Sequence, residues 1–162
     1  MSEAPVTTAL ERLLGPLRPV RVCQIGSLPE LDLGTSAVLQ DTVTELVRVE
    51  PADALLTLPE LPIQDLVAIG RTLETMDCRS GDQLLAGLRD LYARRILLRL
   101  DPNSGCWDHQ RVMAFGFQRL FTLTHEPHTT YYGFDLGNYK VTPDWLNPKN
   151  WANPEMFDRD RW

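Results

Sequence analysis

Apolar side chains recur at helical spacing in the first part of the chain. Their three- and four-residue steps are typical of an amphipathic helix with one buried face. Thr8 and Glu11 have the separation of a capping box, and Gly15 followed by Pro16 predicts the end of the helix. We therefore expect Leu17 to lie just outside it. The apolar positions are Val6, Leu10, Leu13, Leu14 and Leu17.

Short β-prone runs follow along the rest of the chain. The most distinct is residues 65–70, a continuous apolar run of the kind that is buried on both faces of a parallel sheet. Residues 117–124 alternate between apolar and polar positions, which is typical of a strand with one buried face. The predicted strands are 19–25, 44–49, 65–70, 96–100, 117–124 and 131–136.

Helical patterns lie between several of these strands. Leucines along 82–92 mark one helix face, and Asp108 can cap a further helix that Gly116 closes. Residues 27–41 predict a loop, and 52–58 predict two short helical turns. Strand, helix and strand thus alternate in the middle of the chain, which indicates βαβ units with right-handed crossovers. We expect an α/β fold with a mostly parallel open sheet flanked by helices.

The last residues have a different character. Trp145-Leu-Asn-Pro recurs as Trp151-Ala-Asn-Pro, and Trp162 ends the sequence, so three of the four tryptophans lie here. A disordered segment seldom keeps so many aromatic side chains. We therefore predict a 1–140 domain and a 141–162 tail that packs on the domain, on a second copy in a homodimer, or on a protein partner.

The charge balance narrows the classes of partner. Sixteen Lys and Arg against twenty-two Asp and Glu give a net charge of −6, which repels nucleic-acid phosphate and anionic lipid. No apolar run approaches the roughly 20 residues that span a bilayer, and the amino terminus has no secretory signal. We expect neither nucleic-acid nor membrane partners.

The cysteines indicate the compartment. Cys23, Cys78 and Cys106 form an odd set without the density of a disulfide framework, so we expect a reducing, cytoplasmic location. Cys23 lies within a predicted strand and is better interpreted as a small buried side chain than as a nucleophile.

The segment from Asp65 to Asp77, Asp-Leu-Val-Ala-Ile-Gly-Arg-Thr-Leu-Glu-Thr-Met-Asp, resembles the central part of class I S-adenosylmethionine-dependent methyltransferases. The leucine-rich helix and the strand at 95–100 continue this resemblance, which covers about residues 18–136. It implies a Rossmann-like fold with 20–27 as first strand and cofactor loop, and with Glu50 as the acidic residue that ends the second strand. The tail also resembles that of an uncharacterised bacterial family.

The sequence departs from that superfamily at the cofactor loop. Residues 24–29 contain one glycine, Gly26, where the superfamily has two or three that let the backbone approach the cofactor. We interpret the chain as a reduced methyltransferase-like domain that has lost much of its S-adenosylmethionine site and acts by binding or interaction. The alternative is an active small-molecule methyltransferase. In that case Gly26, Ser27 and Glu50 bind the cofactor, and 71–77 face the adenine or the substrate.

A third hypothesis is a zinc-stabilised adaptor. Cys106 and His109 form a Cys-x2-His pair, and His125 and His128 form a His-x2-His pair. Thiolate and imidazole are suitable ligands for tetrahedral zinc. A loop cysteine with surface histidines is the favoured interpretation, so no metal is predicted.

No catalytic residue is predicted. His125, Glu126 and His128 could supply acid or base groups, but no serine, histidine and acid constellation accompanies them. Asp108 is better explained as a helix cap than as a partner that orients His109.

Two further groups have structural interpretations. Arg94, Arg95 and Arg99 are expected at the solvated ends of a strand rather than in a phosphate site. Tyr131 and Tyr132 are expected to pack in the sheet rather than to form a ligand surface.

Overall fold

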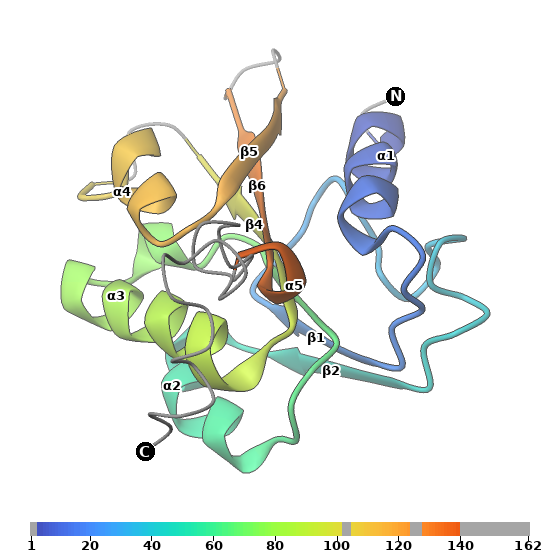
Figure 1. Cartoon of the computed structure of the whole chain (residues 1–162). Coiled ribbons are helices and arrows are strands. Elements are labelled where there is room, and N and C mark those ends of the chain that lie inside the picture. Colours follow the sequence, from blue (N-terminus) through green and yellow to red (C-terminus); the bar gives the residue numbers. More distant parts are fainter. Residues whose placement is uncertain (1–2, 102–104, 124–127, 140–162) are drawn as a thin grey trace, which may run out of the picture.

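The computed structural model describes residues 3–101, 105–123 and 128–139 (Figure 1). The strands are β1 Arg21–Ile25, β2 Glu45–Val49, β3 Leu66–Ile69, β4 Arg95–Leu100, β5 Gln118–Thr122 and β6 Thr130–Asp135. The helices are α1 Glu3–Leu14, α2 Ala54–Thr57, α3 Cys78–Gly87, α4 His109–Ala114 and α5 Leu136–Tyr139. Short helical turns are η1 Pro51–Asp53, η2 Leu58–Glu60, η3 Leu73–Thr75 and η4 Leu88–Tyr92. No helix within the described ranges is long and apolar enough to cross a bilayer.

The strands form one sheet in the order β2-β1-β3-β4-β6-β5. The four strands from β2 to β4 in this order run parallel, and β6 runs antiparallel between β4 and β5. From β1 the chain continues to β2 on one side of β1 and then crosses to β3 on its other side, so the strand order reverses between β1 and β3. This is the topological switch point, beyond whose carboxyl ends open α/β sheets bind ligands. The predicted open, mostly parallel α/β sheet is confirmed.

Two apolar cores cover the two faces of the sheet. On one face, α1 buries Val6 and Leu10 in the same core as Leu97 of β4. On the other face, Leu84 of α3 lies in the same core as Ile69 of β3. Figure 1 shows α1 on one side of the sheet, and α2, α3 and α4 on the other. Burial on both faces explains why β3 and β4 are continuously apolar apart from Arg95 and Arg99.

Two helices begin earlier than the sequence pattern indicates. α1 begins at Glu3, so Thr8 lies within the helix and its predicted capping role is wrong, because the buried Val6 already anchors the first turn. α3 begins at Cys78, where Gly81 is buried against Trp107. That contact joins two residues that are far apart in sequence, so the helical periodicity around Gly81 does not reveal it.

The segment between β1 and β2 contains no helix, as predicted. It nevertheless buries four leucines on the face of the sheet that carries α1. Turns therefore cover a part of this face that a helix could otherwise occupy. The leucines are Leu28, Leu31, Leu33 and Leu39.

The predicted tail, 141–162, lies outside the described residues. The division into a 1–140 domain and a tail therefore stays a prediction.

Candidate functional site

The three residues predicted to hold a cofactor lie at the carboxyl ends of neighbouring strands. Gly26 and Ser27 follow β1, and Glu50 follows β2. The Gly26 N–H donates to the Val49 carbonyl at 3.1 Å, so the ends of the two strands are in contact. The structure therefore brings these positions to the edge of the sheet where the switch point lies.

The chain after β1 packs directly against the chain after β3. The Gly70 N–H donates to the Ile25 carbonyl at 2.7 Å, and the Arg71 N–H donates to the Ser27 carbonyl at 3.0 Å. Gly70 has no room for a side chain, because a methyl group there would overlap the Ser27 carbonyl. Backbone atoms therefore fill the space between these two strand ends.

Thr72 completes this contact. Its hydroxyl donates to the Ile25 carbonyl at 3.2 Å, and the side chain is fully buried. A methyl group on Gly26 would lie 2.6 Å from the Thr72 oxygen, and Gly26 has a positive φ of 71°. The one glycine of the loop is thus required for close packing within the protein.

A cavity remains open beside the end of β2. Its volume is about 460 Å³. Its wall combines carboxylates with apolar groups, and Ser80 beside Asp77 lowers the pKa of the Asp77 carboxyl. Such a wall can accept hydrogen bonds from hydroxyl or amino groups. The main lining residues are Glu50, Pro51, Leu55, Met76, Asp77 and Ser80.

A buried arginine joins the carboxyl end of β4 to the loop after β1. The side chain of Arg99 is 1% exposed, and its guanidinium donates to both oxygens of Glu30 at 2.8 and 2.9 Å. The Tyr131 hydroxyl donates to Glu30 at 2.6 Å. Partial burial would raise the pKa of Glu30, but the hydrogen bonds from Arg99 and Tyr131 outweigh it and hold that pKa below its usual range.

A second carboxylate faces the same guanidinium. Asp101 lies 2.9 Å from Arg99 and accepts a hydrogen bond from the Thr129 hydroxyl at 2.8 Å. Although burial opposes the change, these contacts lower the pKa of Asp101. Arg71, which follows β3, lies 3.6 Å from the other oxygen of Asp101.

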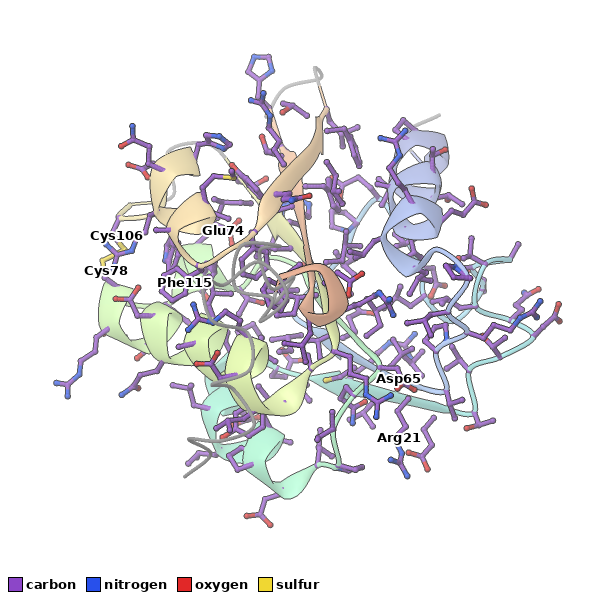
Figure 2. The ribbon with its side chains drawn as sticks, viewed as in Figure 1. Arg21, Asp65, Glu74, Cys78, Cys106 and Phe115 are labelled. Carbon is purple, nitrogen blue, oxygen red and sulfur yellow. A yellow bond between two sulfur atoms is a disulfide. The ribbon has the colours of Figure 1, made fainter. Side chains whose placement is uncertain are left out.

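Glu74, which is labelled in Figure 2, is the third carboxyl group of this cluster, and its hydrogen bonding differs from that of Glu30 and Asp101. One oxygen accepts the Asp101 N–H at 2.9 Å, while the other is buried and accepts no hydrogen bond from a described residue. Burial raises the pKa of Glu74. Its carboxyl group therefore binds a proton more readily than those of Glu30 and Asp101.

The interpretation of Arg99 as a solvated strand end is wrong. Its side chain is buried, whereas Arg94 is exposed and Arg95 pairs with Asp135 at 3.3 Å. A buried charge needs a paired and hydrogen-bonded partner, which Glu30 provides here. The only sequence signal is an arginine inside an otherwise apolar strand, and it does not identify the partner.

The proposed zinc ligands that the structure describes do not converge on a metal site. Cys106 forms a disulfide with Cys78, so its thiolate is not available as a ligand, and the expectation of reduced thiols is wrong for this pair. His109 lies 3.2 Å from the Tyr132 hydroxyl. His125 lies outside the described residues, and within the described ranges no three potential ligands cluster.

Other interpretations from the sequence agree with the structure. Asp108 caps α4, since its carboxylate accepts the Arg111 N–H at 2.8 Å. Cys23 is fully buried, and burial raises the pKa of its thiol to about 11. Tyr131 and Tyr132 are also buried in the sheet.

Comparison with known proteins gives a family and a fold. A family model described as a family of unknown function (DUF6231) matches residues 4–162. No functionally curated protein matches the chain.

The similar solved structures are methyltransferases. Magnesium protoporphyrin IX methyltransferase from Synechocystis, solved with bound S-adenosylmethionine, has a TM-score of 0.52 and 13% identity over 82% of this chain and 78% of its own. A TehB-like S-adenosylmethionine-dependent methyltransferase from Corynebacterium glutamicum has a TM-score of 0.51 and 10% identity over 81% and 86%. Phosphoethanolamine N-methyltransferase 2 from Haemonchus contortus has a TM-score of 0.57 and 13% identity over 96% of this chain and 42% of its own. At these identities the likeness shows the fold, a class I methyltransferase fold.

Proposed function

The chain belongs to the family of unknown function DUF6231, and we propose that it is a methyltransferase-like domain that works by binding rather than by methyl transfer. The observation that carries the proposal is the contact between the loops after β1 and β3. The resemblance to the superfamily implies a glycine-rich loop, whose missing side chains leave room for the cofactor beside the loop backbone. In this chain Gly26 and Gly70 leave room for the protein's own backbone instead.

The Arg99 cluster supports this proposal because it holds the same loop in place. Glu30 lies three residues after Ser27, and its carboxylate is fixed by Arg99 and Tyr131. Opening the space between β1 and β3 would require the loop to move away from these partners. Loss of a buried ion pair costs about 3 to 5 kcal/mol when one partner is left unpaired.

The cavity beside Glu50 is where we place ligand binding. It lies at the carboxyl end of β2, outside the contact between Ser27 and Gly70. The cavity is large enough for a small molecule, because ligand sites commonly occupy about 300 to 1,000 Å³. We propose that Glu50 and Asp77 accept hydrogen bonds from that ligand.

Calorimetric titration with S-adenosylmethionine and S-adenosylhomocysteine tests the proposal. We expect no saturable heat with either compound, because the methionine part of the cofactor has no crevice to enter. Low-micromolar binding of either compound would overturn the proposal. Circular dichroism of the same sample establishes that the protein is folded.

The cavity also supports a second candidate, an active methyltransferase with a minimal site. In that case Gly26, Ser27 and Glu50 contact the cofactor, and transfer of a labelled methyl group to a small molecule should be detectable. Glu50→Gln should then weaken binding at least tenfold, because the variant loses the charged acceptor. Asp53→Asn is the matched control, an exposed carboxylate three residues further on.

Location and partners form part of the same proposal. We propose that nucleic acid is not a partner, because the net charge is −6. A cytoplasmic location stays part of the proposal, although the Cys78–Cys106 disulfide removes the argument from the cysteines. We propose that residues 141–162 make the contacts with a protein partner or with a second copy of the chain.

A further inference from the structure

A disulfide joins the first residue of α3 to the segment before α4. Cys78 begins α3, and Cys106 immediately precedes the buried Trp107. Figure 2 shows the two sulfur atoms bonded at the end of α3. The bond closes a loop of chain that contains all of β4, with a sequence separation of 28.

Both cysteines of the bond are at least partly exposed to solvent. Cys78 is exposed and Cys106 is partly exposed, whereas the remaining cysteine, Cys23, is fully buried. Exposed disulfides are the labile ones in thiol exchange. Cys78 also lies in the first turn of a ten-residue helix, whose backbone N–H groups favour the thiolate that exchange requires.

The bond is one of several contacts that hold the two segments together. A methyl group on Gly81 would lie 2.8 Å from the Trp107 ring, so α3 and Trp107 are in close contact. Arg111 of α4 pairs with Asp82 of α3 at 2.7 Å and lies over the Trp107 ring at 5.1 Å. These noncovalent contacts keep the cysteines near one another when the bond is open.

The helix turn that carries Cys78 borders the cavity beside Glu50. Asp77 and Ser80, on either side of Cys78 in sequence, both line that cavity. Any loosening of the first turn of α3 therefore moves cavity residues. The covalent bond limits this movement by fixing the first residue of the helix.

We propose that Cys78 and Cys106 form a reversible thiol–disulfide site, with a low-molecular-weight disulfide such as glutathione disulfide as its oxidant. The state of this bond sets how firmly the first turn of α3 is held against the cavity. This inference concerns the cysteine pair and does not depend on whether S-adenosylmethionine binds.

The exchange proceeds in two balanced steps. The Cys78 thiolate attacks one sulfur of glutathione disulfide, which forms a mixed disulfide and releases one glutathione thiolate. The Cys106 thiolate then attacks the Cys78 sulfur, which forms the protein disulfide and releases the second glutathione thiolate. Two protein thiols thus lose two electrons and two protons, and one glutathione disulfide becomes two glutathione thiols.

The first test is a redox titration of the full chain with mixtures of reduced and oxidised glutathione. Alkylation under denaturing conditions followed by mass spectrometry counts the free thiols. We expect one alkylated cysteine in the oxidised form, three in the reduced form, and the same midpoint from both directions. The proposal would be overturned if the disulfide stays intact in excess reduced glutathione. It would also be overturned if the reduced protein does not form the disulfide again with glutathione disulfide.

The second test is hydrogen–deuterium exchange on the oxidised and reduced forms. Peptides covering 76–84 and 105–112 should exchange about tenfold faster after reduction, while peptides from β1 and β3 serve as the internal reference. Equal exchange in the two forms would refute the link between the bond and the cavity wall.

Variants separate this effect from a general loss of stability. Cys78→Ser and Cys106→Ser should each show the fast exchange of the reduced form under both conditions. Cys23→Ala, the control, should keep the full response to glutathione, because Cys23 does not take part in the bond. A response that persists in Cys78→Ser would assign it to another group and contradict the proposal.

Discussion

Glu30 and Arg99 are 69 residues apart in sequence and form a two-point ion pair with N–O distances of 2.8 and 2.9 Å. The pair joins the loop after β1 to the centre of the sheet. Arg99→Met should lower the free energy of unfolding by about 3 kcal/mol, because Glu30 then loses its cation. Urea denaturation measures this change.

The matched control for that variant is an exposed ion pair. Arg21→Met removes the partner of Glu45, where both side chains are about half exposed. We expect a change below about 1 kcal/mol. Equal losses in the two variants would show that the buried pair does not hold the loop.

The acidic partners of Arg99 predict a loss of stability at low pH. The pKa of Glu30 is lowered from 4.5 in the folded protein, and that of Asp101 from 3.8. Each contribution to stability is complete above the ordinary value and is lost as the pH falls through the lower folded value. Urea denaturation between about pH 6 and pH 3 should show this decline. The decline should be weaker in Glu30→Gln, and an unchanged slope would contradict the assignment.

Glu74 predicts the opposite dependence on pH. Its pKa is raised above 4.5, so its contribution to stability is present below that value and is lost as the pH rises through the folded pKa. The free energy of unfolding of Glu74→Gln, taken relative to that of the natural chain, should therefore be higher near neutral pH than near pH 4, by on the order of 1 kcal/mol. The exposed Glu60→Gln is the control. A difference that does not vary with pH would contradict the prediction.

The contact between the loops after β1 and β3 predicts a cost for any side chain at Gly70. Gly70→Ala should lower the free energy of unfolding by about 2 kcal/mol or more, because the new methyl group would overlap the Ser27 carbonyl. Gly137→Ala is the control, since Gly137 is exposed and its nearest contact for a methyl group is an Asp135 oxygen at 3.3 Å. Similar stability of the two variants would show that the loops can separate easily.

The aromatic tail gives a prediction about residues 141–162. Truncation after Lys140 should lower the melting temperature or expose an apolar surface that promotes aggregation, because packed indoles each bury on the order of 150 to 250 Å². If the tail contacts a second copy, light scattering should also show conversion of a dimer to monomers. The edge strands of the described sheet, β2 and β5, are the natural docking places. An unchanged melting temperature, solubility and oligomeric state would favour a partner-recognition peptide.

The strands were predictable because their signal is local. Residues 65–70 and 96–100 are short apolar runs, and a strand buried on both faces needs no other feature. The absence of a helix after β1 was also predictable from 27–41, which have no helical stripe. The family resemblance rested on these same local runs and on their order.

The site was less predictable because its contacts join distant parts of the chain. Glu30 lies in a loop without periodic pattern, and nothing near it indicates that Arg99 is its partner. The spacing of Cys78 and Cys106 carries no information about distance in space, which depends on how α3 and α4 pack. Helical periodicity likewise missed the start of α3, because Gly81 is buried by Trp107 rather than by an apolar stripe.

The obstruction at Gly70 has a consequence for protein engineering. The atom that fills the space is the carbonyl oxygen of Ser27, which every amino acid carries. Ser27→Gly would therefore copy the composition of a cofactor loop without making room for a ligand. Lengthening the loop between Ile25 and Leu28 by inserted residues is the change that would move this carbonyl, so widening the space at Gly70 requires a longer loop rather than a different side chain at position 27.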